Sequence, residues 1–101
     1  MDFALGVLAD KDYPAMVRAV APWARSFSVY APENPRALAA DKLAACVSEV
    51  LVEEGRADAV PVRACAEAAE ALRAARAAAG SQGVAVAFGT LYAIADLMAA
   101  L

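Results

Sequence analysis

The sequence predicts a single α/β domain in which a parallel sheet of four strands has helices on both faces. Three observations lead to this prediction. Short apolar runs without polar alternation are typical of strands buried on both faces of a parallel sheet. Apolar residues at helical spacing fill the segments between these runs. At 101 residues, the chain is long enough for one domain with a modest core and too short for a second.

The composition excludes several classes of protein. Of the chain, 62% is hydrophobic, but thirty residues are alanine, so the predicted core is thin and rich in helix. A net charge of -3 without a basic cluster argues against nucleic-acid binding. No apolar run reaches the roughly twenty residues that cross a bilayer, and no signal peptide opens the chain, so we expect a cytoplasmic protein that does not enter the membrane.

The first strand and helix lie within one short stretch. The apolar run that starts at Phe3 ends abruptly at the charges of Asp10, Lys11 and Asp12. Pro14 suits a first helical turn, and Asp12 can cap the amides that this turn leaves free. The sequence therefore predicts a strand followed by a helix over Tyr13–Val20.

The remaining elements alternate in the same way along the chain. Glycines at positions 55 and 80 are suited to end the two middle helices, because glycine tolerates left-handed geometry. Short connections between alternating strands and helices favour right-handed parallel crossovers. The expected strands are Ser26–Tyr30, Ala59–Ala64 and Val84–Phe88, and the expected helices are Ala39–Glu53, Ala66–Ala79 and Thr90–Leu101.

Candidate binding residues lie where strands turn into helices. Ligands of open α/β sheets gather at the carboxyl ends of strands, which places Asp10, Lys11 and Asp12 at a candidate site. Lys11 is one of two lysines against seven arginines, so a compact ammonium is of interest there; a solvated turn is the equally weighted alternative. Arg36 can hold a carboxylate in bidentate fashion, although an exposed loop arginine is the commoner reason for such a residue.

The start of the last predicted helix is a second candidate. Thr90 lies where free amides favour an anion, with helix capping as the commoner explanation, and Tyr92 either points to the same site or packs. The sequence contains no P-loop and no dinucleotide-binding glycine motif. It also has no histidine, so neither a zinc site nor a nucleophile with a histidine base can be assembled from Cys46 and Cys65. We interpret both cysteines as small apolar residues.

Three stretches together resemble a known family. The chain is similar, over nearly its whole length and in order, to the carboxyl-terminal domain of folylpolyglutamate synthase or the bifunctional dihydrofolate synthase, enzymes related to the Mur ligases. The resemblance implies a Rossmann-like, three-layer fold with the strand order fourth, first, second, third. The matching stretches are Leu5-Gly6-Val7-Leu8-Ala9-Asp10-Lys11-Asp12, Pro35-Arg36-Ala37-Leu38 and Phe88-Gly89-Thr90-Leu91-Tyr92.

The resemblance also implies roles for the matched residues. Lys11 would contact the carboxylate of incoming glutamate, with Asp10 and Asp12 shaping the turn. Thr90 would offer its hydroxyl and the helix-start amides to the same substrate, with Tyr92 nearby. Arg36 lies in Glu-Asn-Pro-Arg, which resembles an Asp-Asn-Pro-Arg stretch that some Mur relatives use to hold an amino acid, although the first residue differs.

Proteins of this family contain segments that residues 1–101 do not. Its domain opens with a further strand and helix that reach the nucleotide, and a separate domain binds ATP and magnesium. We therefore expect residues 1–101 to be a truncated piece of a ligase of folate biosynthesis and one-carbon metabolism, inactive alone and without a cofactor of its own. Loss of the opening strand would leave Val84–Phe88 as a bare edge, so self-association through this strand is expected.

Two other interpretations of the function remain open from the sequence. A stand-alone binding or receiver-like signalling module with a doubly wound sheet would also carry aspartates after its first strand. Against it, Cys65 and Tyr92 fill none of the acceptor aspartate and lysine positions that a receiver requires. A purely structural interaction module is the third possibility.

Overall fold

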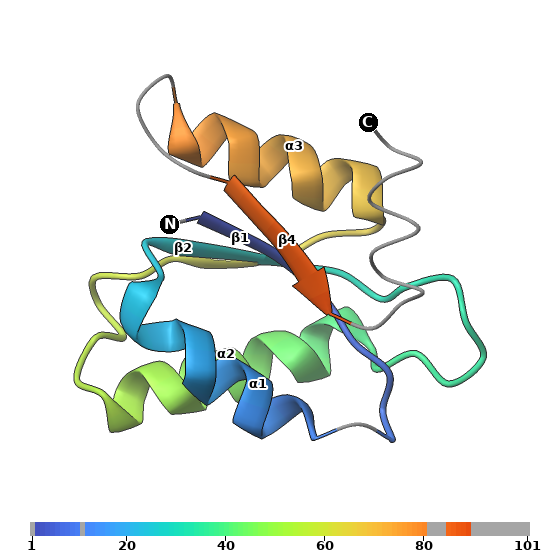
Figure 1. Ribbon diagram of the computed structural model, residues 1–101, viewed down its shortest axis with the longest axis horizontal. Helices are drawn as coiled ribbons and strands as arrows, with labels where there is room; N and C mark the ends of the chain where they lie inside the picture. The colour runs from blue at the N-terminus through green and yellow to red at the C-terminus, as the bar shows by residue number, and fades with distance from the viewer. Residues whose placement is uncertain (1, 11, 81–84, 90–101) are drawn as a thin grey trace.

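The fold is that of an α/β domain in which strands and helices alternate, as Figure 1 shows for a computed structural model that describes residues 2–10, 12–80 and 85–89. Each of the first three strands is followed by a helix, as expected for a parallel sheet. The elements are β1 (Asp2–Gly6), α1 (Tyr13–Val20), the 3-10 helix η1 (Ala21–Trp23), β2 (Ser26–Val29), α2 (Ala40–Glu53), β3 (Val62–Ala64), α3 (Ala68–Ala79) and β4 (Ala85–Gly89).

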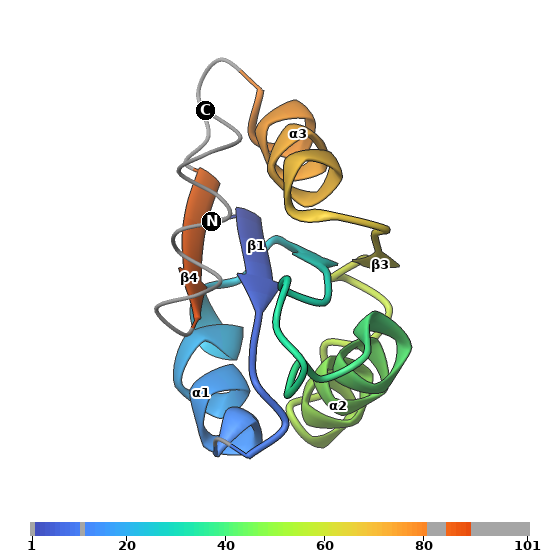
Figure 2. The ribbon, with the colours of Figure 1, turned by 90° about the vertical axis from the view of Figure 1, so that its right-hand side faces the viewer.

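The sheet has the order β3-β2-β1-β4, and every pair of neighbouring strands is parallel. This is the predicted order. Helix α3 covers one face of the sheet, and α1 and α2 cover the other (Figure 2). The predicted α/β class, with helices on both faces, is therefore confirmed. The last helix expected, Thr90–Leu101, lies outside the described residues.

Helices α1 and α2 lie close to their predicted boundaries; α2 begins at Ala40, one residue later than predicted, and ends at Glu53 as predicted. Helix α1 covers Tyr13–Val20 as predicted, and the Asp12 side chain accepts a hydrogen bond from the backbone N–H of Ala15 at 3.3 Å. This bond satisfies one of the amides left free at a helix start. Helix α2 ends at Glu53, two residues before Gly55, whose backbone has a φ of +69°. The predicted role of Gly55 is thus confirmed.

Strand β3 and helix α3 begin later than predicted. The predicted strand Ala59–Ala64 is shortened to Val62–Ala64, because Ala59 and Val60 both donate to the carbonyl of Arg56 and so form a turn. The Arg56 guanidinium is in turn bound to the carbonyls of Ala21 and Ala24. Helix α3 begins at Ala68 and not at residue 66, because Glu67 is extended. Propensity alone did not reveal either turn.

Two separate cores lie on the two faces of the sheet. The core beneath α1 and α2 is built from large side chains, including Phe3 and Phe27, whose rings stack with centroids 5.6 Å apart. The core beneath α3 is smaller and consists of Ala4, Tyr30, Cys65, Ala71, Leu72 and Ala75. Alanine therefore makes up a larger share of the core beneath α3 than of the core beneath α1 and α2.

Gly6 is required by its contact with Tyr30. A Cβ atom at position 6 would lie 2.7 Å from the ring of Tyr30, a separation that side chains do not tolerate. Tyr30 is fully buried, and its backbone N–H donates to the carbonyl of Leu5 at 3.0 Å. The ring therefore has little freedom to move away from strand β1.

An ion pair joins the strands at the end of the sheet where β1 and β2 begin. Asp2 is 1% exposed, and one of its carboxylate oxygens accepts a hydrogen bond from Arg25 at 2.7 Å. The other carboxylate oxygen accepts from the hydroxyl of Ser26. Arg25 also donates to the carbonyls of Ala78 and Ala79, where α3 ends. The pair thereby fixes α3 to the start of the sheet.

The Gly6→Ala substitution is expected to lower the free energy of unfolding by about 1–3 kcal/mol, because an added methyl group overpacks the Tyr30 ring. Urea denaturation measures this loss. In a Tyr30→Leu background, which removes the ring, the same substitution should cost clearly less. Equal losses in both backgrounds would show that the ring contact is not the cause.

The Asp2→Asn substitution is expected to make the stability less dependent on pH. Burial by itself raises the pKa of Asp2, but hydrogen bonds from Arg25 and Ser26 and the charge of Arg25 together hold that pKa below its ordinary value of 3.8. Ionised Asp2 therefore stabilises the fold above the unfolded-state pKa, and this contribution is lost as pH falls through the lowered folded pKa.

At neutral pH we expect the Asp2→Asn variant to be about 1–3 kcal/mol less stable than the wild type, since a buried hydrogen-bonded carboxylate is lost. Thermal unfolding between pH 2 and pH 7 measures the difference, which should shrink below pH 4. Asp58→Asn, at an exposed position, is the control. A difference that stays constant down to pH 2 would contradict this role of Asp2.

Candidate functional site

The candidate site lies where the chain leaves β1. Beyond Gly6, the backbone runs antiparallel to a segment of the loop between β2 and α2. Leu38 donates to the carbonyl of Val7 at 3.0 Å, and Ala9 donates to the carbonyl of Arg36 at 2.8 Å. An isolated bridge between Leu8 and Ala37 completes this contact. The two stretches that carry predicted site residues are therefore held side by side.

This pairing brings Asp10 and Arg36 together. The Nη1 atom of Arg36 lies 2.8 Å from the Oδ2 atom of Asp10, and the side chains remain 59% and 47% exposed respectively. From the sequence, the two residues are separate candidates, 26 positions apart. An ion pair this exposed contributes little to stability, typically about 0–1 kcal/mol. The remaining N–H groups of the Arg36 side chain are exposed and available to a ligand that approaches from solvent.

Asn34 organises the backbone at Arg36, a role that the sequence analysis did not assign. Its side-chain oxygen accepts a hydrogen bond from the N–H of Arg36 at 2.9 Å, and its carbonyl accepts from Ala37 at 2.9 Å. Asparagine commonly bonds to the backbone two residues further on and so closes a turn. The Asn34-Pro35 dipeptide was the sequence signal for this turn.

The other predicted site residues are distributed around the same corner or lie outside the described residues. Asp12 is exposed and caps α1, as its sequence position predicted. Lys11, Thr90 and Tyr92 lie outside the described residues. Strand β4 ends at Gly89, which pairs with Gly6 of β1, so the carboxyl ends of both strands are neighbours.

The acidic residues, the cysteines and the helices of the described part of the chain bear on three other kinds of site. In it, no group of three or more His, Cys, Asp or Glu side chains is placed to hold a metal ion. Both cysteines are free, and burial first and neighbouring glutamates second raise the pKa of Cys46 and of Cys65, which keeps the thiols protonated. None of the described helices is long and apolar enough to span a membrane.

The fold and the corner define a class of protein. Ligands of open α/β sheets bind beyond the carboxyl ends of the strands, so the polar side chains at the end of the central strand β1 form a candidate ligand site. Of the comparisons with known proteins, only the comparison with solved structures finds a match. No protein-family model matches the chain. No curated protein sequence matches it either.

Two solved structures share the fold over almost the whole chain. Mycobacterium tuberculosis folylpolyglutamate synthase complexed with ADP superimposes with a TM-score of 0.75 at 24% identity, covering 97% of this chain. Structures of the same enzyme complexed with ADP and AMPPCP give a TM-score of 0.70 at 25% identity over 96% of this chain. The match covers 23% and 22% of those chains.

The structural match confirms the predicted resemblance at the level of the fold. The chain has the fold of a part of folylpolyglutamate synthase, and this is consistent with the carboxyl-terminal domain inferred from the motifs. Because the chain spans less than a quarter of the length of the enzymes that it matches, their activity is carried over to it only as a proposal.

Proposed function

We propose that this chain is the glutamate-binding, carboxyl-terminal domain of an ATP-dependent ligase that adds glutamate to folate or dihydropteroate. The fold shared with folylpolyglutamate synthase supports the class of enzyme. The observation that carries the glutamate-binding role is the ion pair of Asp10 with Arg36 at the carboxyl end of β1. Its two members come from the two stretches that resemble substrate-contacting segments of the family.

The geometry of the pair explains how Arg36 would bind glutamate. Asp10 accepts a hydrogen bond from one guanidinium nitrogen of Arg36. The turn closed by Asn34 fixes the backbone from which the Arg36 side chain extends. A guanidinium has five N–H donors, so several remain for a substrate carboxylate. Asp10 is then a positioning residue, and Arg36 is the residue that touches the substrate.

Three further residues complete the proposed site. Lys11, between Asp10 and the helix cap Asp12, would supply a second positive charge for the carboxylates of glutamate. Thr90 and Tyr92 follow Gly89 in the sequence, and Gly89 pairs with Gly6 on β1. Thr90 would bind with its hydroxyl and Tyr92 would lie nearby.

The domain would contribute positioning to the reaction. In the parent ligase, ATP with magnesium, bound by another domain, would convert the folate-type carboxylate into an acyl phosphate that the amine of glutamate attacks. Holding the amine in place turns a bimolecular encounter into an oriented one. The chain alone has no phosphate-binding loop, so it should neither hydrolyse ATP nor ligate glutamate. We propose the cytoplasm as its location.

In a full-length ligase containing this domain, Lys11→Ala and Arg36→Gln are expected to raise the KM for glutamate about ten- to a hundredfold, because each removes a charge-assisted hydrogen bond. The KM values for ATP and for the folate substrate should stay within about twofold. Steady-state kinetics with each substrate varied in turn measures the effect. Equal losses for all three substrates would contradict the proposal.

Matched controls separate binding from folding. Arg73→Gln removes the same charge from an exposed position on α3 and should leave glutamate use unchanged. Arg36→Lys keeps the charge without the planar fork and should give an intermediate KM. Because the Asp10–Arg36 pair is exposed, the Arg36→Gln variant should unfold within about 1 kcal/mol of the wild type.

We also propose self-association through the fourth strand, predicted at Val84–Phe88 and observed at Ala85–Gly89. Within the described residues, β4 pairs with β1 and lies at the edge of the sheet. Its sequence has no charge and no proline to discourage pairing with another chain. Light scattering of the chain should show dimers at high concentration, and Ala87→Lys should abolish them. A monomer at every concentration would refute this.

A further inference from the structure

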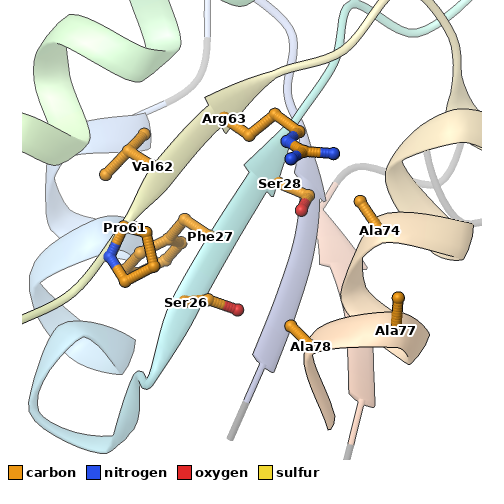
Figure 3. Close-up of a pocket in the computed structure, with 9 residues that line it drawn as sticks. All are labelled: Ser26, Phe27, Ser28, Pro61, Val62, Arg63, Ala74, Ala77 and Ala78. Carbon is orange, nitrogen blue, oxygen red and sulfur yellow. The ribbon is translucent and has the colours of Figure 1, made fainter. Parts of the chain in front are cut away.

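A groove separates α3 from the β3 edge of the sheet and lies on the face opposite α1 and α2. It has a volume of about 510 Å³, within the range of about 300–1,000 Å³ typical of small-molecule sites. Figure 3 shows the side chains that line it. One wall is formed by Ala74, Ala77 and Ala78 of α3. From the strands, Ser26, Ser28 and Arg63 face the groove, with Pro61 at its margin, whereas the side chains of Phe27 and Val62 point to the other side of the sheet.

The small side chains on α3 account for the space. On the opposite face of the sheet, large side chains fill the interval between helix and strands. On this face, the α3 wall of the groove consists of methyl groups, and the sheet offers it two serines of β2 (Figure 3). The result is a groove with one apolar wall of methyl groups, against which a planar or extended apolar body can lie.

Two polar groups converge in this groove. The side chain of Arg63 extends from β3 across Ser28 toward Ala74 (Figure 3). In the described part of the chain, no carboxylate forms a salt bridge with Arg63. The hydroxyl of Ser26 is already bound to Asp2, whereas that of Ser28 faces the groove. A guanidinium above a hydroxyl is a donor pair suited to a carboxylate.

The two ends of the groove differ in charge. Near Ala78, the Asp2 carboxylate behind Ser26 and the carbonyl groups at the end of α3 are all bound by Arg25, so the charges there compensate one another. Arg63 makes the other end positive. A ligand with a single negative charge can place it at Arg63 and keep a neutral body near Ala77 and Ala78. The α3 residues that line the groove lie beyond the first turn of that helix, so they offer no free helix-start amides to a dianion such as phosphate.

We propose that this groove binds a small monocarboxylate with a planar apolar body. The carboxylate lies against Arg63 and Ser28, and the body lies between the alanines of α3 and the strands. The site is separate from the corner of Asp10 and Arg36, which lies beyond the end of β1, so it does not depend on the glutamate-binding role proposed above. No residue of the two sites is shared.

Titration of the chain with 2-naphthoate and with the neutral 2-naphthamide tests the proposal, since the two probes differ in charge but hardly in shape. Backbone amide shifts in NMR spectra report where each probe binds. We expect naphthoate to shift the amides of Ser28, Arg63 and Ala74, and to bind about tenfold more tightly than naphthamide. Inorganic phosphate should leave these amides unchanged.

Variants distinguish the two parts of the site. Arg63→Gln should abolish the preference for naphthoate, and its control Arg73→Gln, on an exposed part of α3 outside the groove, should retain it. Ala77→Leu fills the groove from an exposed position and should weaken both probes, with thermal unfolding confirming that each variant is folded. Three results would overturn the proposal. They are equal affinity for the two probes, no binding of either probe at tenfold molar excess over millimolar protein, and amide shifts confined to the Asp10 corner.

Discussion

The geometry of the candidate site depends on the backbone pairing between Val7–Ala9 and Arg36–Leu38. Strand β1 ends at Gly6, yet the chain continues in a fixed direction because hydrogen bonds at Val7 and Ala9 join it to the loop after β2. A loop that crosses the strand end in this way holds two segments that are far apart in sequence. The ion pair of Asp10 with Arg36 follows from that pairing. Without it, both side chains would be on independent loops.

The sequence predicted the elements whose signals are local. Helix α1 was predicted to the residue, because Asp12 and Pro14 mark its start and the inner face at Val17 is apolar. The strand order followed from the family resemblance. By contrast, the contact between Asp10 and Arg36 could not be predicted from either segment, because the loop that carries Arg36 has no strand periodicity. The shortened start of β3 was missed for a related reason: Arg56 determines the turn through bonds to η1.

The unequal distribution of side-chain volume has a structural effect of its own. Large residues on the α1 and α2 side fill the interval between helices and sheet, whereas α3 contributes alanines and the single leucine Leu72. Alternation in Ser26-Phe27-Ser28 indicates that β2 has one polar face. This alternation is the sequence signal for the groove beside α3.

The position of the Arg25 network has a consequence for how such a domain can change over time. Asp2, Ser26 and the carbonyls at the end of α3 are joined where the strands begin, at the opposite end of the sheet from Asp10 and Arg36. Residues that hold the layers together are thus different from those that face solvent at the corner. Substitutions at the corner can accumulate without loss of the fold, so a lineage can acquire a new ligand preference on an unchanged scaffold.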